Sequence, residues 1–197
     1  MTRRPGVGAP RWALGADFDS VLGAARSGAC WACTRIYRSL APAVAGYLRA
    51  QGVDDPDDLT SEVFLRVFSG CGSFSGDEAQ FRAWVFTIAH SRLVDARRAR
   101  DRTPEVGVLE DECPDGRGPT MAGADDEAMD RLAVDGVHQL LDALTPDQRN
   151  VVALRIVGQL SVDEVATALE KPPGAIKALQ RRALATLRRR LAPGAVR

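Results

Sequence analysis

The stretch that decides the fold is Leu160–Leu191, with the sequence LSVDEVATALEKPPGAIKALQRRALATLRRRL. Ser161 and Glu164 have the spacing of a capping box, in which each side chain bonds the other residue's backbone amide at the start of a helix. Pro172 ends this helix because proline cannot continue the helical hydrogen bonds, and Pro173 suits the first turn of a second helix. The stretch therefore predicts two helices joined by a tight turn.

Each of the two helices carries one apolar stripe, which indicates a face packed against a core. In the first helix the stripe is formed by Val162, Val165, Ala166 and Leu169. In the second helix the residues predicted to point inward are Ile176, Ala183, Leu187 and Leu191. A short helix, a turn and a second helix make a helix-turn-helix, whose second helix enters the major groove of DNA.

The second helix and the residues after it are strongly basic. Residues 171–197 contain eight Lys or Arg and no Asp or Glu. Such an uncompensated charge repels itself, and phosphate contacts relieve the repulsion while releasing counterions. The alternative is a solvated cationic helix that packs on its neighbour and binds nothing, but we expect DNA binding.

The overall composition is that of an ordinary soluble protein. Of the 197 residues, 45% are hydrophobic and 26% are charged, which suffices for one domain or two small ones with a buried core. The formal net charge is zero, but residues 101–130 hold ten Asp or Glu against two Arg. This segment therefore carries −8 and the rest of the chain +8.

Targeting and membrane segments are not predicted. No apolar run approaches the roughly 20 residues needed to span a bilayer. Residues 1–15 include arginines but lack the apolar stretch of a signal peptide. We therefore expect a cytoplasmic protein without membrane insertion and with a disordered N-terminus over residues 1–15.

The four cysteines and two histidines do not predict a metal site. Cys30 and Cys33 have C-x-x-C spacing, but no second ligand pair follows, and a zinc site needs four ligands. We expect small core residues here, with redox or metal chemistry as the weaker alternative. The sequence also lacks paired carboxylates in a site context, a phosphate-cradling glycine motif and a nucleophile–base pair. No catalytic residue, enzyme activity or cofactor is therefore predicted.

The N-terminal half is predicted to form a series of helices. Residues 18–50 keep apolar residues at helical spacing, interrupted at Gly28, and Pro42 either kinks this region or begins a new helix. Asp55 caps the next helix, with Pro56 at its first position. That helix shows an acidic and an apolar face together, and its spacing alone favours a well-capped surface helix.

A glycine-rich loop and a long helix follow. Residues 69–80 contain three glycines and Phe74 and are predicted to form a flexible loop, and residues 81–102 an amphipathic helix. Aromatic residues interleaved with arginines after a loop favour binding of single-stranded nucleic acid by stacking. Trp84 fits better as a core residue, and Phe74 and Phe86 are the more open candidates.

Residues 103–127 are rich in Pro, Gly and acids without a period, which predicts a linker. A helix is expected over residues 132–144, followed by a second capping box at Thr145 and Gln148 and a helix that ends at Gly158. No segment alternates convincingly with period two. The chain is therefore predicted to be all-α, with two small helical domains joined by a flexible acidic linker, the C-terminal one a helix-turn-helix.

These patterns resemble an extracytoplasmic-function (ECF, group 4) sigma factor of the sigma-70 family, a bacterial transcription initiation factor. DPDDLTSEVFLRVF (55–68) is similar to the helix that binds core RNA polymerase, FRAWVFTIAHSRLVDARRAR (81–100) to the helices that melt and read the −10 element, and residues 140–184 to the −35-reading domain. The linker is too short for the additional domain of larger sigma factors. The resemblance implies region 2 over 16–102, a linker over 103–130, region 4 over 131–192 and a tail over 193–197.

The resemblance also implies roles for three groups of residues. The predicted core-polymerase-binding residues are Asp55, Asp58, Leu59, Glu62, Val63 and Arg66, on the clamp helices of the β′ subunit. The predicted −10 DNA-binding residues are Ser73, Phe74, Phe86, Ser91, Arg92, Asp95 and Arg98, beside a loop that holds a flipped base. The predicted −35 DNA-binding residues are Lys177, Ala178, Gln180, Arg181 and Arg182, with arginine to guanine the expected specific contact.

The recognition helix departs from the family's usual pattern at two positions. Leu179 replaces a usual arginine and Gln180 a usual apolar residue. Either the helix is rotated slightly, or Gln180 reads a base and Leu179 contacts a protein. Ser91 also stands where the family often has asparagine, so the −10 contact there is expected to differ.

The partners that the resemblance implies are core RNA polymerase, through its β′ clamp helices and β flap, promoter DNA, and an anti-sigma protein that holds the factor inactive. The expected location is the cytoplasm, at the nucleoid when the factor is active. A simple helix-turn-helix transcriptional regulator that does not bind core polymerase is the alternative. The helices at 55–68 and 81–100 argue against it, because such a regulator needs neither.

Overall fold

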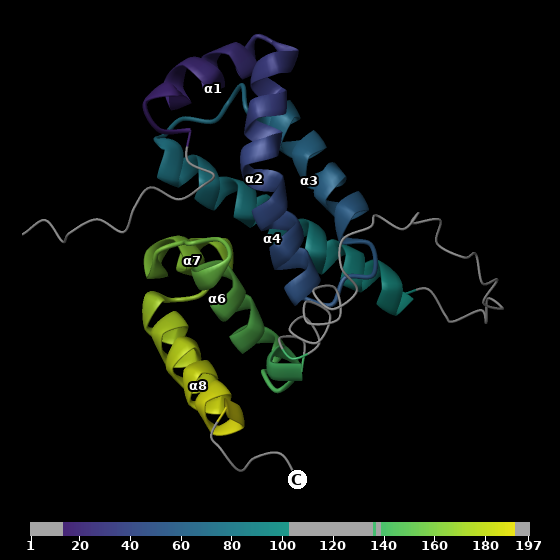
Figure 1. The fold of residues 1–197 in the computed structure, drawn as a ribbon, viewed down its shortest axis with the longest axis vertical. Coiled ribbons are helices and arrows are strands. Elements are labelled where there is room, and N and C mark those ends of the chain that lie inside the picture. Colours follow the sequence, from purple (N-terminus) through teal and green to yellow (C-terminus); the bar gives the residue numbers. More distant parts are fainter. Residues whose placement is uncertain (1–13, 103–135, 137–138, 192–197) are drawn as a thin grey trace, which may run out of the picture.

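The structure, a computed structural model, describes residues 14–102, 136 and 139–191 (Figure 1). The predicted N-terminal disorder, the acidic linker, the C-terminal tail and part of the helix expected at 132–144 lie outside the described residues. Every regular element within the described ranges is helical, which confirms the all-α prediction.

The N-terminal half consists of a 3-10 turn and four α-helices. These elements are η1 (Gly15–Asp17), α1 (Phe18–Arg26), α2 (Cys30–Ala50), α3 (Pro56–Gly70) and α4 (Glu78–Arg102). Gly28 separates α1 from α2 with φ +81°, a left-handed conformation that glycine adopts without steric cost. Pro42 lies inside α2 and neither ends it nor begins a new helix. In Figure 1, α3 lies beside α2, and α4 crosses behind α2; α4 also contacts α3.

The loop between α3 and α4 is shorter than the sequence predicts. Helix α3 continues to Gly70, and α4 begins at Glu78 rather than at residue 81. The early start follows from a capping pair that the prediction missed. Asp77 Oδ1 accepts from the Gln80 amide at 2.8 Å, and the Asp77 amide donates to Gln80 Oε1 at 2.9 Å. Two orphan amides are thereby satisfied, and the loop is reduced to residues 71–77.

The C-terminal half follows the predicted pattern closely. It comprises helical residues 139–142 and the helices α6 (Pro146–Ile156), α7 (Val162–Ala168) and α8 (Pro173–Leu191). Both predicted capping boxes are present, at Thr145 with Gln148 and at Ser161 with Glu164. One inward residue was predicted wrongly, because Leu191 in the last turn of α8 is 66% exposed.

Burial divides α3 into two faces. Leu59, Val63 and Val67 repeat every four residues and lie in the core, with Leu59 only 7% exposed. Leu65 falls outside this repeat and is 71% exposed. The rotation of α3 therefore removes Leu59 and Val63 from the surface and leaves Leu65 on it.

We expect Leu59→Ala to lower the free energy of unfolding by about 2–5 kcal/mol, because it leaves a cavity in the core. Leu65→Ala, the matched control on the same helix, is expected to change it by less than about 0.5 kcal/mol. Denaturant unfolding of the two variants measures both values. A larger loss for Leu65→Ala than for Leu59→Ala would mean that α3 is rotated differently.

Candidate polymerase and nucleic-acid interface

A groove between α3 and α4 brings together residues that the sequence assigns to two different partners. One end of it is lined by Arg66 and Ser69 of α3 and by Ser91, Arg92 and Asp95 of α4. The other end is lined by side chains that include Asp55, Asp58, Glu62, Arg92, Asp95 and Arg102. Most of the predicted core-polymerase residues thus share one groove with three of the predicted −10 residues, Ser91, Arg92 and Asp95.

Arg92 and Glu62 form an ion pair across this groove. The Arg92 guanidinium also lies 3.7 Å from Oδ2 of Asp95, one turn further along α4. Both partners of the pair are partly exposed, so the pair itself contributes about 1 kcal/mol or less. Its larger effect is geometric. Glu62, a predicted polymerase contact, and Arg92, a predicted DNA contact, bind each other in this structure and not two separate partners.

The predicted core-polymerase residues divide into exposed and buried ones. Asp58 and Arg66 are exposed, and Asp55 is exposed while its Oδ1 accepts the Asp58 amide at 2.8 Å as the N-cap. Leu59 and Val63 are buried in the core, so the prediction that they contact the polymerase is wrong in this conformation. Their spacing in the sequence is that of a buried apolar stripe, but the assignment followed the resemblance to the family and not this spacing.

Leu65 is the exposed apolar residue that sequence reasoning missed. It follows Asp58 by seven residues and Glu62 by three, so all three lie along one side of α3. The signal was present in the sequence, because Leu65 is out of phase with the stripe formed by Leu59 and Val63.

Of the predicted −10 residues on α4, three form an exposed ridge, Arg92 is half-buried and Phe86 is buried. Ser91, Asp95 and Arg98 are exposed and recur at i, i+4 and i+7, which places them on one side of the helix. Phe86 is fully buried, and its ring meets that of Tyr47 edge-on at 5.9 Å. The prediction that Phe86 is an open stacking residue is therefore wrong.

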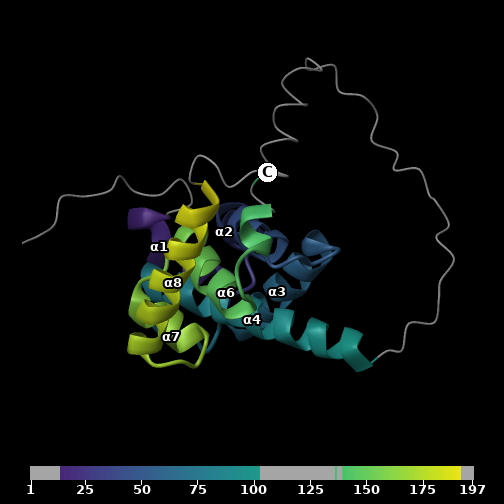
Figure 2. The same cartoon turned by 90° about the horizontal axis from the view of Figure 1, so that it is seen from below.

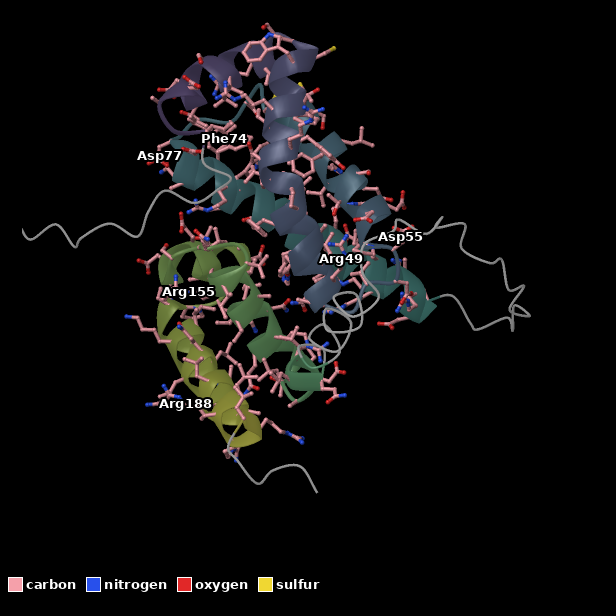
Figure 3. The ribbon with its side chains drawn as sticks, in the orientation of Figure 1. Arg49, Asp55, Phe74, Asp77, Arg155 and Arg188 are labelled. Atoms are coloured by element: carbon pink, nitrogen blue, oxygen red, sulfur yellow. The ribbon has the colours of Figure 1, made fainter. Side chains whose placement is uncertain are left out.

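The loop at 71–77 is held in place from two sides. Phe74 is half-buried, with its ring 5.2 Å from the rings of both Phe81 and Trp84. From α1, Arg26 donates to the carbonyl of Cys71 at 3.2 Å and to the carbonyl of Phe74. Figure 3 shows Phe74 beside the start of α4. Ser73 is exposed on this loop, and the positioning role of Arg26 had no signal in the sequence.

The recognition helix α8 presents a basic surface. It carries six Lys or Arg and no Asp or Glu, and within the described residues none of the six forms an ion pair with a carboxylate. Lys177, Arg181 and Arg182 are exposed, whereas Ala178 and Gln180 are half-buried. Figure 3 shows Arg188 directed away from the body of the molecule.

Leu179 resolves one of the alternatives left open by the sequence. It is buried and belongs to the hydrophobic core of the chain. Leu179 therefore faces inward in the place of a usual arginine, as a slight rotation of α8 would produce, and does not contact another protein in this conformation.

The cysteines do not form a metal centre in the part of the chain that the structure describes. Cys30 is exposed, Cys33 is half-buried and Cys71 is buried, and all three are free thiols. Burial raises the pKa of Cys33, which disfavours the reactive thiolate. Among the described residues, no group of three or more His, Cys, Asp or Glu side chains could hold a metal ion. No described helix is both long and apolar enough to cross a bilayer.

Comparisons with known families match both halves of the chain. Residues 36–103 match the family described as Sigma-70 region 2, and residues 135–187 match Sigma-70 region 4. The two matches together cover more than half of the 197 residues.

Individual relatives agree with these matches. The chain is 34% identical to the ECF RNA polymerase sigma factor BldN of Streptomyces coelicolor, over 89% of this chain and 68% of BldN. It is 30% identical to the ECF RNA polymerase sigma factor SigD of Mycobacterium tuberculosis, over 88% of this chain and 84% of SigD.

A solved structure shares the fold. CnrH in complex with the cytosolic domain of CnrY superposes with a TM-score of 0.63 at 24% identity, over 87% of this chain and 95% of CnrH. With both sigma regions matched and the relatives covered over two thirds or more of their length, the chain belongs to the ECF RNA polymerase sigma factors of the sigma-70 family.

Proposed function

We propose that this sigma factor docks on core RNA polymerase through the exposed side of α3, reads duplex −35 DNA with α8, and reads melted −10 DNA with α4 and the loop at 71–77. The observation that carries the proposal is the combination of two surfaces in one chain. A basic recognition helix whose cations pair with no carboxylate among the described residues accompanies an α3–α4 groove that binding to duplex DNA alone does not require. The simple helix-turn-helix regulator leaves that groove unexplained.

The polymerase contact is assigned to the side of α3 that the core leaves free. Asp58, Leu65 and Arg66 offer a carboxylate, an apolar side chain and a guanidinium on this surface. A single exposed leucine is common on protein surfaces, so Leu65 supports a docking surface only together with its charged neighbours. An apolar centre with a charged rim is the usual composition of a protein interface. A second docking contact with the β flap falls to region 4.

The −10 contact is assigned to the ridge formed by Ser91, Asp95 and Arg98 and to the loop beside it. A serine hydroxyl bonds several bases, a carboxylate accepts from the cytosine amino group, and arginine binds guanine or phosphate. Extracting a base costs a few kcal/mol. Stacking near Phe74 returns about 1–3 kcal/mol, which offsets much of that cost.

A protein partner that holds the factor inactive completes the proposal. CnrH, which shares the fold, was solved with the cytosolic domain of CnrY bound to it. By analogy, an anti-sigma protein covers the polymerase-binding side of α3 and the basic side of α8 in this chain. The factor acts in the cytoplasm at the nucleoid, where core polymerase and promoters are found.

Reversing charge and polarity on α3 tests polymerase docking. We expect Asp58→Arg combined with Leu65→Arg to weaken binding to core RNA polymerase at least about tenfold, or 1.4 kcal/mol. Both residues are exposed, so the free energy of unfolding should change little. Asp19→Arg, an exposed carboxylate reversed on α1, is the matched control and should bind core polymerase like the wild type.

The measurement is the dissociation constant for core polymerase, followed by run-off transcription from a promoter library. Wild-type protein should start transcription at defined pairs of −35 and −10 elements. Binding to duplex DNA without any binding to core polymerase would overturn the proposal in favour of the simple regulator.

The recognition helix makes a separate prediction. Arg181→Ala should cost about 1–3 kcal/mol on −35 duplexes and relax the preference at one base position. Arg188→Ala, another exposed arginine on the same helix, should weaken binding evenly across sequences, as a phosphate contact does. Dissociation constants for single-base variants of the −35 duplex at fixed salt distinguish the two effects. An even loss for Arg181→Ala would exclude a base-specific role for it.

A further inference from the structure

The two halves of the chain pack directly against each other. Figure 2 shows α6 and α7 lying against the N-terminal half, and α7 contacts α4 while α6 contacts α2. One hydrophobic core runs through both halves, from Val21 of α1 to Ile176 of α8. The sequence did not predict this arrangement, because the two halves are separated by the linker.

A hydrogen-bonded group of three residues lies at the junction. Tyr47 of α2 donates its hydroxyl proton to Oδ1 of Asn150 in α6 at 3.1 Å. Its oxygen lies 3.0 Å from Nδ1 of His90 in α4, which donates to it because the one hydroxyl proton is already used. The aromatic ring of Tyr47 and the side chain of Asn150 are buried. Burial raises the pKa of Tyr47 and lowers that of His90, so both stay neutral near pH 7.

Two close contacts flank this group. A Cβ atom at Gly46 would lie 3.3 Å from Cγ1 of Val157, so glycine lets α2 and the end of α6 approach tightly. On the other side, Arg82 of α4 reaches the carbonyl of Gln159 at 3.5 Å. Gln159 has φ +53°, a conformation that costs energy in a residue other than glycine and that tertiary contacts must hold. The two halves are therefore closely packed at this junction, with complementary shapes.

The interface borders the ridge assigned to −10 DNA. The pocket between α4 and α7 is lined by the ridge residues Ser91, Asp95 and Arg98 and, from the end of α7, by Leu169 and Glu170. Glu170 therefore places a negative charge beside the ridge that is proposed to bind the negatively charged DNA backbone. In this arrangement DNA that approaches the ridge meets region 4 and a like charge.

The spacing of the two DNA-reading helices leads to the same conclusion. Helix α7 contacts both α4 and α8, and packed helix axes lie 8–10 Å apart, so α4 and α8 are roughly 20 Å apart at these contacts. Promoter elements centred near −35 and −10 are about 25 base pairs apart, or about 85 Å at 3.4 Å per base pair. Because the −10 residues Ser91, Asp95 and Arg98 line the pocket at α7 itself, only the length of α8, about 28 Å, can add to this distance, and the sum stays well below the roughly 85 Å between the promoter elements while α7 contacts both helices.

We propose that the contact between Tyr47, Asn150 and His90, with Gly46 against Val157, is an intramolecular latch that holds region 4 on the −10 face of region 2. The latch must open before the chain can bind both promoter elements. The inference rests on the proposed function for its effect on transcription, whereas the latch itself is a property of the free protein.

A reversible cross-link tests the latch in the full chain. Gly46→Cys and Val157→Cys are introduced after the four native cysteines are replaced by Cys30→Ser, Cys33→Ser, Cys71→Ala and Cys113→Ser. The close approach of Gly46 and Val157 brings the two new thiols within disulfide reach. Gly23→Cys with Val157→Cys is the control, because a side chain at Gly23 meets nothing within 4 Å.

We expect oxidised glutathione to close the Gly46–Val157 bridge rapidly and to leave the control pair reduced. Each bridge formed reduces one oxidised glutathione to two thiols. The bridged protein should lose binding to a −10 single-stranded oligonucleotide and promoter transcription at least about tenfold, because no open state remains. Dithiothreitol should restore both.

Each other outcome has a separate meaning. Failure of the bridge to form in folded protein, or full transcription by the bridged protein, overturns the latch. If the reduced protein also ignores core polymerase while the bridge forms, the proposed function fails and the closed interface stands.

A second variant avoids the cysteine replacements. Gly46→Gln places a longer side chain against Val157 and should open the interface, seen as a larger hydrodynamic radius and tighter binding to the −10 oligonucleotide. Gly23→Gln, also within a helix, should change neither. An unchanged radius and affinity for Gly46→Gln would overturn the latch.

Discussion

The burial of one apolar stripe per helix fixes how each helix is rotated, and the functional surfaces follow from that rotation. In α3 the stripe of Leu59, Val63 and Val67 faces the core, so Asp58 and Leu65 face outward. In α8 the buried Leu179 turns Lys177 and Arg181 toward solvent. A slip of one residue turns a helix by about 100° and exchanges apolar for polar side chains, which hydrophobic burial strongly opposes.

Local chemistry was predictable from the sequence because its partners lie within four residues of each other. The capping boxes at Ser161 and Thr145 and the break at Gly28 are of this kind, whereas the equally local capping pair of Asp77 and Gln80 was missed. Exposure was predicted less well. Phe86 and Leu59 were assigned to partners although their spacing fits the core, since a family pattern says which helix binds but not which of its sides is free.

Contacts between distant residues carried no signal in the sequence. Arg26 holds the loop at Phe74 across 48 residues, and Arg92 pairs with Glu62 across 30. An exposed arginine on a helix has many possible partners, and only the packing of α1, α3 and α4 selects one. The contact of Tyr47 with Asn150 spans 103 residues and the linker, so it depends on how two separately encoded halves fit together.

The chemistry at the junction between the halves suits an interface that opens. The junction combines apolar contacts with the polar group of Tyr47, His90 and Asn150. These three side chains can bond to water once the halves separate, which lowers the cost of opening compared with a junction that is apolar throughout. The same polarity penalises a poor fit, because an unpaired buried hydroxyl or amide costs about 1–3 kcal/mol. The interface therefore favours two states, closed with its hydrogen bonds made or open with them solvated, over a continuum of loose arrangements. A sigma factor whose DNA-reading ridge is covered in one state and accessible in another requires two such distinct states.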